Sequence, residues 1–195
     1  MILSNEFLSN EVKYKKHLDE HLACITKVYN EYENTIALEI TGEIIGGEKR
    51  KNNTFSTCMI RKSLKQRIPR HDVSKFSKKE FIPYCNDFCS NSKDEPIEEE
   101  FQKAREHHYA HNDHHPEFWI YEVDDKKVSI PMRDDAFAEM IIDWIAEAMM
   151  ENSNTLEWWN NKGKTEKGKY LDTSDIRFLD NFFNRYSNNF DFSNR

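Results

Sequence analysis

The chain has 195 residues, of which 37% are hydrophobic and 13% aromatic, and its formal net charge is −7. This length suits one domain with a sizeable core, so we expect a single domain over residues 1–195, with 152–195 as its C-terminal helical extension. The negative charge argues against stable binding to duplex DNA, which needs a basic surface that displaces counterions. No signal peptide and no membrane-spanning apolar run is evident, so we expect a cytoplasmic protein without membrane contact.

Helical periodicity dominates a chain with only five Gly and five Pro residues, and it predicts an all-α fold. The first helix is expected from about Ser9 to Tyr32. Its apolar stripe contains His21 and has His17 at its edge. In residues 34–53 apolar and polar residues alternate and three glycines follow, so we expect an irregular insertion there, with a short hairpin as one form of it.

The next helix is expected to resume near Thr54 and to end at Pro69, which lacks the backbone donor that a helix interior needs. Ser77 and Glu80 have the spacing of a capping box, and flanking phenylalanines supply a hydrophobic staple. This pattern predicts a helix that starts at Ser77 and leaves the preceding His-Asp pair on a short connection.

The second half of the chain continues the helical pattern. We expect a loop at 90–96, a helix from about Ile97 to Asn112, a loop at 120–133, an apolar helix capped by Asp134 or Asp135, and a last helix that begins near Thr173.

A basic segment lies between Lys49 and His71, where eight Lys or Arg residues occur without any Asp or Glu. It can form a solvated basic helix face or a rim that attracts phosphate. The eight residues are Lys49, Arg50, Lys51, Arg61, Lys62, Lys65, Arg67 and Arg70.

Five of the eight histidines fall within nine consecutive positions, in the stretch HHYAHNDHHP at 107–116. Imidazole and carboxylate groups are the ligands that Zn, Mn, Fe and similar divalent ions prefer. On a helix these histidines form two faces that cannot both point at one ion, so only some of them can be ligands. The full set of candidates is His17, His21, His71, Asp72, His107, His108, His111, His114, His115 and Asp143.

Asp143 lies away from the centre of the apolar stripe of its predicted helix. With Glu139 and Glu147 it could form an ordinary acidic surface stripe. The helix is nevertheless apolar on nearly every side, which predicts burial, where an unpaired carboxylate is costly. A metal ion is one way to satisfy that carboxylate.

The order H…HD…HH…HH…D, with HDVSKFSKKEFIPY in the middle, resembles the HD-domain superfamily of metal-dependent phosphohydrolases. A closer resemblance is to an uncharacterised, often phage-encoded family, the DUF5662 type. It rests on the blocks His71–Phe81, His107–Trp119 and Glu139–Trp144. The superfamily resemblance implies an HD-like helical bundle in which a His, an adjacent His-Asp and a distant Asp hold one or two metals. Extra histidines there bind a second metal or phosphate.

Carried over to this chain, the resemblance implies a divalent transition metal cofactor, one or two ions of Mn, Fe, Zn, Ni or Co. His17 stays open as an alternative to His21, His114 and His115 are alternatives to each other, and His111 lies outside the implied site. The implied metal ligands are His21, His71, Asp72, His108, His114, His115 and Asp143.

The implied function is a metal-dependent phosphohydrolase that acts on a nucleotide or another small phosphoester, with a metal-activated water as nucleophile. Asp72, Lys75 and His107 are the implied catalytic residues: a bridging ligand, a cation for the phosphoryl oxygens, and an orienting partner or general acid. Arg67 and Arg70, together with Lys75, are expected to hold phosphate. Two other interpretations remain: a structural ion in a non-catalytic scaffold or nucleotide-sequestering protein, and a buried His/Asp hydrogen-bond network without metal.

Overall fold

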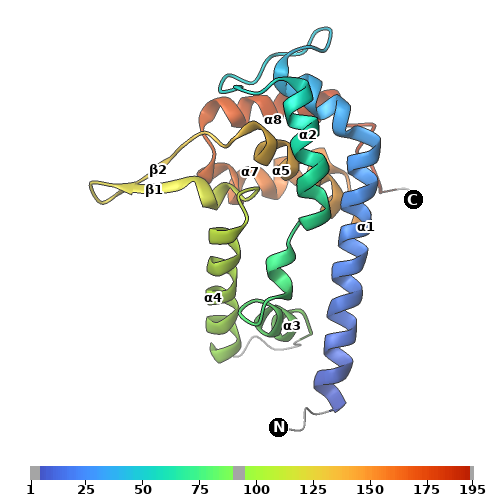
Figure 1. The fold of residues 1–195 in the computed structure, drawn as a ribbon, viewed down its shortest axis with the longest axis vertical. Helices are drawn as coiled ribbons and strands as arrows, with labels where there is room; N and C mark the ends of the chain where they lie inside the picture. Colours follow the sequence, from blue (N-terminus) through green and yellow to red (C-terminus); the bar gives the residue numbers. More distant parts are fainter. Residues whose placement is uncertain (1–4, 90–94, 194–195) are drawn as a thin grey trace.

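The computed structural model describes residues 5–89 and 95–193, and it confirms the all-α class (Figure 1). The α-helices are α1 (Asn5–Thr41), α2 (Thr57–Arg67), α3 (Phe81–Cys89), α4 (Glu95–His111), α5 (Asp134–Met150), α6 (Thr155–Trp158), α7 (Lys164–Glu166) and α8 (Thr173–Arg185). Short 3-10 turns are η1 (Ile68–Arg70), η2 (Val73–Phe76), η3 (Pro116–Trp119) and η5 (Gly168–Tyr170), and η4 (Trp159–Gly163) is a π-helical turn. One antiparallel hairpin joins β1 (Ile120–Val123) to β2 (Lys126–Ser129).

Helix α1 is longer than the sequence pattern predicts, because it continues through residues 34–41. Ile36 and Ile40 are fully buried, and their spacing of four residues also fits a helical face. Gly42 follows with a φ of 72°, the left-handed conformation that commonly ends a helix. The prediction of an irregular insertion that starts at residue 34 is therefore wrong, and the irregular segment begins only after Thr41.

The predicted helix start at Ser77 is also wrong, because α3 begins at Phe81. The Glu80 carboxylate does not cap the backbone of Ser77. It accepts hydrogen bonds from the side chains of Ser74 and two histidines instead. Phe76, the expected staple residue, is 48% exposed. A residue pair with the spacing of a capping box thus serves a tertiary contact.

The segment 120–129, predicted as part of a loop, forms the β1–β2 hairpin, which projects from the helical body (Figure 1). Asp124 and Asp125 at its turn both have positive φ, as a two-residue hairpin turn of type I′ requires. The predicted loop at 90–96 falls mostly outside the described residues, and its last two residues begin α4. The last helix starts at Thr173 as predicted, and Asp172 caps it.

Two apolar clusters lie along α1, and a buried polar layer separates them. The larger cluster joins the C-terminal half of α1 to α2, α5 and α8, and Phe190 and Phe192 near the end of the chain belong to it. The smaller cluster consists of Tyr14, Leu18 and Cys85 and ties α1 to α3. Within the described residues, no helix combines the length and apolarity that crossing a membrane needs.

The basic segment does not form one solvated face. Arg50 is 1% exposed and pairs with Asp134 and Asp175. Arg61 forms an ion pair with Glu33 across to α1. Several arginines of the segment thus neutralise carboxylates of this chain. The other exposed cations of the segment are Lys49, Lys51, Lys62, Lys65 and Arg70.

Candidate metal centre

A first group of ligand atoms converges where α1, α5 and the connection between η1 and η2 meet. The Nε2 atoms of His21 and His71 lie 3.3 Å apart, and Oδ1 of Asp143 lies 3.2 Å and 3.4 Å from them. Ligand atoms bound to one ion at about 2.0–2.2 Å lie about 3.0–3.5 Å apart in tetrahedral or octahedral geometry. All three side chains are buried, and together they could hold a metal ion.

A second group lies beside the first and consists of Asp72, His108, His114 and His115. Oδ1 of Asp72 is 3.3 Å from Nε2 of both His108 and His114, and Nε2 of His115 is 2.8 Å from that of His108. Burial, reinforced by His114 and His108, lowers the pKa of His115 well below its usual range. That imidazole is therefore neutral, which is the form that binds a metal.

Asp72 connects the two groups. Its Oδ2 lies 3.7 Å from Nε2 of His71 and 2.7 Å from the ammonium of Lys75, while its Oδ1 faces the second group. Its φ of 53° is in the left-handed region, which is uncommon for a residue other than glycine. This conformation separates η1 from η2, and the carboxylate that follows His71 there reaches both groups.

A glutamate stands on the Nδ1 side of four of these histidines. Where Nδ1 donates to the carboxylate, Nε2 carries the lone pair, and it is the Nε2 atoms that face the centre. Carboxylates that accept such a hydrogen bond fix the ring orientation and the tautomer that a metal needs, and His71 and His108 have this hydrogen bond, whereas His21 and His114 have the carboxylate nearby without one. The Nδ1–carboxylate distances are 2.9 Å for His71–Glu139, 2.9 Å for His108–Glu80, 3.3 Å for His21–Glu147 and 3.6 Å for His114–Glu139.

The buried charges do not balance without a further cation. Lys75 and Arg67 contribute two positive charges to this region, against four buried carboxylates. Unpaired negative charge in a low-dielectric interior is costly. Protonated histidines or a divalent ion would neutralise the excess. The four carboxylates belong to Asp72, Glu80, Glu139 and Asp143.

The pKa values of the first group reflect this imbalance. Burial disfavours the imidazolium form of His71, but Asp72, Asp143 and Glu139 outweigh burial and raise the pKa of His71 well above its usual range. Burial also raises the pKa of the Asp143 carboxyl, yet His21 and His71 outweigh that effect and hold it well below its usual range. The region thus attracts positive charge strongly.

Some buried polar atoms in the centre have no hydrogen-bond partner among the described residues, including Oδ1 of Asp72 and Nε2 of His114. These two atoms face each other at 3.3 Å without hydrogen-bond geometry. Leaving buried polar groups unpaired costs about 1–3 kcal/mol each. A cation between them would satisfy both atoms, so the donor set fits a divalent metal.

The profile of a family of unknown function (DUF5662) matches residues 10–185. The chain belongs to this family. The match spans all the candidate ligands and confirms the resemblance to the DUF5662 type, whose description assigns no activity. No curated protein and no solved structure matches the chain.

The DUF5662 chain brings together all seven predicted metal ligands. His21, rather than His17, reaches the centre, and the His17 ring packs on Phe88 with centroids 4.6 Å apart. His111 is exposed and stacks on His107, and it lies outside the candidate ligand groups of the described residues. His114 and His115 both belong to the second group, so the structure does not select between them.

The residues predicted to handle phosphate lie in different surroundings. Lys75 binds Asp72 inside the centre, and Arg70 is exposed on η1. The Nδ1 atom of His107 lies 2.6 Å from Glu80, so His107 shares this carboxylate with His108. These placements leave the predicted catalytic and phosphate-binding roles as predictions.

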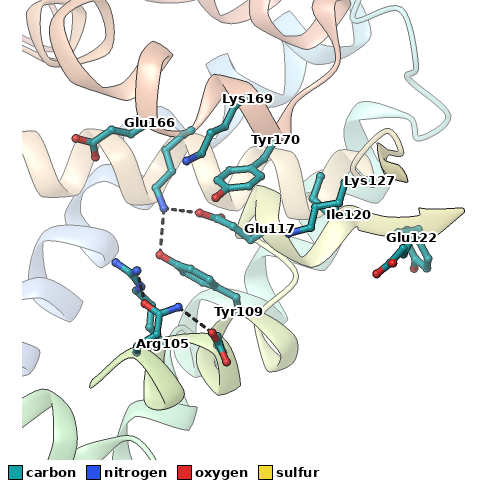
Figure 2. Close-up of a pocket in the computed structure, with 13 residues that line it drawn as sticks. Arg105, Tyr109, Glu117, Ile120, Glu122, Lys127, Glu166, Lys169 and Tyr170 are labelled. Atoms are coloured by element: carbon teal, nitrogen blue, oxygen red, sulfur yellow. Dashed lines mark hydrogen bonds and ion pairs between the residues drawn. The ribbon is translucent and has the colours of Figure 1, made fainter. Parts of the chain in front are cut away.

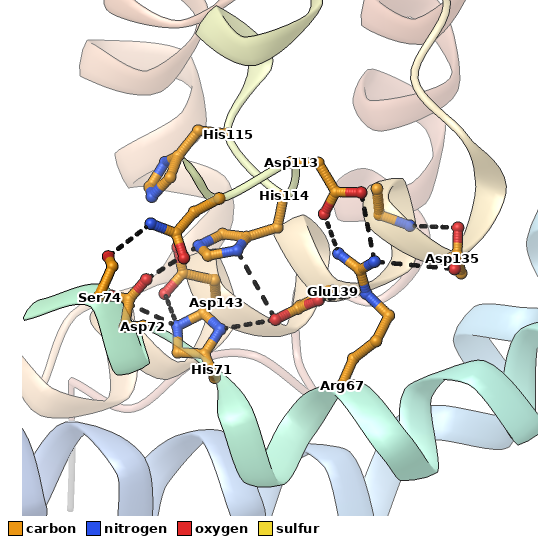
Figure 3. Close-up of polar contacts among 12 residues, drawn as sticks. Arg67, His71, Asp72, Ser74, Asp113, His114, His115, Asp135, Glu139 and Asp143 are labelled. Carbon is orange, nitrogen blue, oxygen red and sulfur yellow. Dashed lines mark hydrogen bonds and ion pairs between the residues drawn. The ribbon is translucent and has the colours of Figure 1, made fainter. Parts of the chain in front are cut away.

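Arg67 is surrounded by carboxylates of this chain, as Figure 3 shows. Its Nε donates to Glu139 at 2.5 Å, and its terminal nitrogens face Asp113 and Asp135. Asp113 directly precedes His114, and Glu139 orients His71. Arg67 therefore ties the segment that carries His114 to α2 and α5, and these contacts give it a positioning role.

The glutamates behind the histidines are the site residues that sequence reasoning missed. Glu139 was open to interpretation as part of a surface stripe, yet it is 3% exposed. Asn112 and Ser74 were missed as well: the Asn112 amide donates to Ser74 Oγ, and the Ser74 hydroxyl donates to Glu80. A signal existed, since both residues lie inside the motif blocks, next to the predicted ligands.

Proposed function

We propose that the protein is a metal-dependent phosphohydrolase that acts on a small phosphoester, with a nucleotide as the expected substrate. The observation that carries the proposal is Asp72, whose two carboxylate oxygens face two adjacent groups of ligand atoms. In the two-metal sites of phosphatases, two adjacent ions stabilise the attacking and leaving oxygens of a phosphoryl transfer. The resemblance to the HD-domain superfamily supports the same reaction.

A divalent transition metal (Mn, Fe, Zn, Ni or Co) bound there supplies a Lewis acid for a phosphoryl oxygen and lowers the pKa of the attacking water. Lys75 provides positive charge beside Asp72 for the phosphoryl oxygens. Burial opposes the charge on Lys75, but Asp72 outweighs burial and raises its pKa, so the ammonium persists at neutral pH. Exposed Arg70, one residue before His71, is proposed to hold the remaining phosphate charge.

His107 acts in this proposal through Glu80 and not as a general acid. Its Nδ1 contacts the same carboxylate that orients His108, and it lies outside the candidate ligand groups of the described chain. Replacing His107 with Gln should therefore change metal affinity more than the pH profile of turnover.

The test is a panel of nucleotides and phosphodiesters incubated with the wild type and with Mn²⁺, Ni²⁺ or Co²⁺. We expect turnover that His71→Ala and Asp72→Ala lose and that the exposed variant His111→Ala keeps. The proposal is wrong if the wild type hydrolyses none of these compounds beyond the level of the two site variants.

One observation favours a second candidate, a metal-stabilised scaffold without catalysis. His108 and His114 are each 2% exposed, and a closed site with only protein ligands is typical of a structural ion. In that case metal would raise the melting temperature of the wild type while no phosphoester in the panel is hydrolysed.

A further inference from the structure

A cleft of about 600 Å³ lies between α4, the hairpin and the η5 turn (Figure 2). Its residue Tyr109 contacts His115 of the histidine centre. We propose that this cleft binds a polar heterocyclic ring, such as a nucleobase, carried by the phosphorylated substrate. The inference rests on the proposed function for the phosphate end of that ligand. The volume lies within the range of about 300–1,000 Å³ that is usual for small-molecule sites.

Tyr109 lies between the cleft and the histidine centre. It lines the cleft and directly follows His108, and its ring lies 5.0 Å from the His115 ring between centroids. A ligand in the cleft is therefore one side chain away from the second ligand group, a separation that a sugar ring between base and phosphate can bridge.

The inner wall of the cleft is held in place by Lys167. Its ammonium donates to Glu117 at 2.8 Å and to the Tyr109 hydroxyl at 3.3 Å, and it lies 4.9 Å from the centre of the Tyr109 ring. Glu117 follows His115 by two residues, so the same contacts connect the cleft wall to the histidine segment. A wall that is fixed before binding reduces the ordering cost of a ligand.

The lining indicates the chemistry of the ligand. Three tyrosines, Tyr109, Tyr121 and Tyr170, offer aromatic surface for a planar ring. Four basic residues and four glutamates alternate with them, which disfavours both a polyphosphate chain and a purely apolar group. A heterocycle with donors and acceptors on its edge matches this mixture.

Two cations on the rim, Lys127 and Lys169, are not held in ion pairs among the described residues. Lys169 lies 4.8 Å from the centre of the Tyr170 ring. Lys127 lies opposite Glu122 in the backbone register of the hairpin, so both side chains project from the same face of the two strands. The neighbouring Lys126 does not line the cleft and offers a matched control.

The experiment measures binding of the four common nucleosides, their 5′-monophosphates and ribose 5-phosphate to the full chain with Mn²⁺ by calorimetry. We expect at least one monophosphate to bind about tenfold more tightly than ribose 5-phosphate, the amount that base stacking supplies. Tyr170→Leu and the exposed-site variant Tyr121→Leu should reduce this preference. Lys127→Gln should weaken nucleoside binding, while Lys126→Gln should not.

The outcomes distinguish failure of the cleft proposal from failure of the proposed phosphohydrolase activity. A nucleoside carries no phosphate, so its binding to the wild type and to His71→Ala tests the cleft alone. Equal affinity for ribose 5-phosphate and all the monophosphates, or a base preference that both tyrosine variants retain, overturns the cleft proposal even if phosphoesters are hydrolysed. Nucleoside binding that the tyrosine variants lose supports the cleft even if no phosphoester is hydrolysed.

Discussion

Two buried polar clusters contact helix α5, one at its first residue and one near its middle, and they differ in how their charges are satisfied. In the first, the Arg50 cluster, Nε and Nη2 of Arg50 each donate to Asp175 at 2.7 Å, and Nη1 donates to Asp134 at 2.8 Å. The second oxygen of Asp134 accepts from the backbone of Thr54 and Phe55. Every carboxylate oxygen in this cluster has a partner within the chain.

The histidine centre is also buried, apart from the half-buried His115, but it leaves Oδ1 of Asp72 and Nε2 of His114 without hydrogen bonds in the described structure. Its ligand atoms converge on common points, where only the pairs His21–His71 and His108–His115 of the described residues lie at hydrogen-bond distance between Nε2 atoms. Buried polar groups in proteins are nearly always satisfied. The comparison indicates that the Arg50 cluster is satisfied within the chain, whereas the histidine centre has unpaired atoms placed where they could hold a metal ion.

The largest expected effect is on the Arg50 cluster. Arg50→Met should lower the free energy of unfolding by about 3–5 kcal/mol, because two carboxylates stay buried without their cation. Burial already raises the pKa of Asp175 despite the opposing effect of Arg50. Urea unfolding with and without added metal should give the same loss. A loss that depends on metal would contradict the division between the clusters.

A smaller effect is expected from metal binding at the histidine centre. Free Mn²⁺ or Zn²⁺ at 100 times its dissociation constant should stabilise the wild type by about 2.7 kcal/mol. His71→Ala should abolish this gain, whereas Arg50→Met, if folded, and His111→Ala should keep it. Thermal unfolding over a metal titration measures the shift, and a gain that His71→Ala retains would place the ion elsewhere.

The orienting carboxylates allow a finer test. Glu139→Gln should weaken metal binding about 10–100-fold, the usual effect of losing a partner that orients a ligand. Arg67→Met should weaken it less, because Arg67 contacts the ligands only through Glu139 and Asp113. Competition with a chelating dye gives the affinities. If Glu139→Gln binds metal as the wild type does, the histidines do not depend on this carboxylate.

The smallest expected effect lies outside both clusters. Asp172 caps α8 by accepting from the backbone of Ser174 and Asp175, so Asp172→Ala should cost about 1 kcal/mol. Burial disfavours the ionised form of the Asp172 carboxyl. Hydrogen bonds from the Ser174 side chain and from backbone N–H groups outweigh burial and lower the pKa of Asp172. Its contribution is therefore present above the unfolded pKa of about 3.9 and is lost as pH falls through the lower folded value. Unfolding at pH 7 and at pH 2–3 should show the difference shrink.

The sequence identifies the candidate ligands more readily than the glutamates that contact them. The cluster of histidines is unusual, and so is an aspartate within an apolar helix. Composition and residue order are therefore enough to identify both as candidate ligands. The spacing of Glu80 from Ser77 predicts a capping box, because rules for helix ends consider only neighbouring residues. The actual partners of Glu80, His107 and His108, lie far along the chain. A contact between distant segments cannot be read from either segment alone.

The fold shows the same limit at two places. The alternation in residues 34–41 suggested a break, but packing on α5 favours the helical period that these residues also contain. The hairpin at 120–129 carried a usable signal, two consecutive aspartates between residues that alternate in polarity.

We propose that the histidine centre holds a divalent metal. Elemental analysis of protein purified without chelators or metal-affinity resin tests it most directly, with Asp72→Ala beside the wild type. We predict one or two equivalents of a transition metal in the wild type and a clear reduction in the variant. A wild type without stoichiometric metal, whose melting temperature does not rise with Mn²⁺ or Zn²⁺, would contradict the claim.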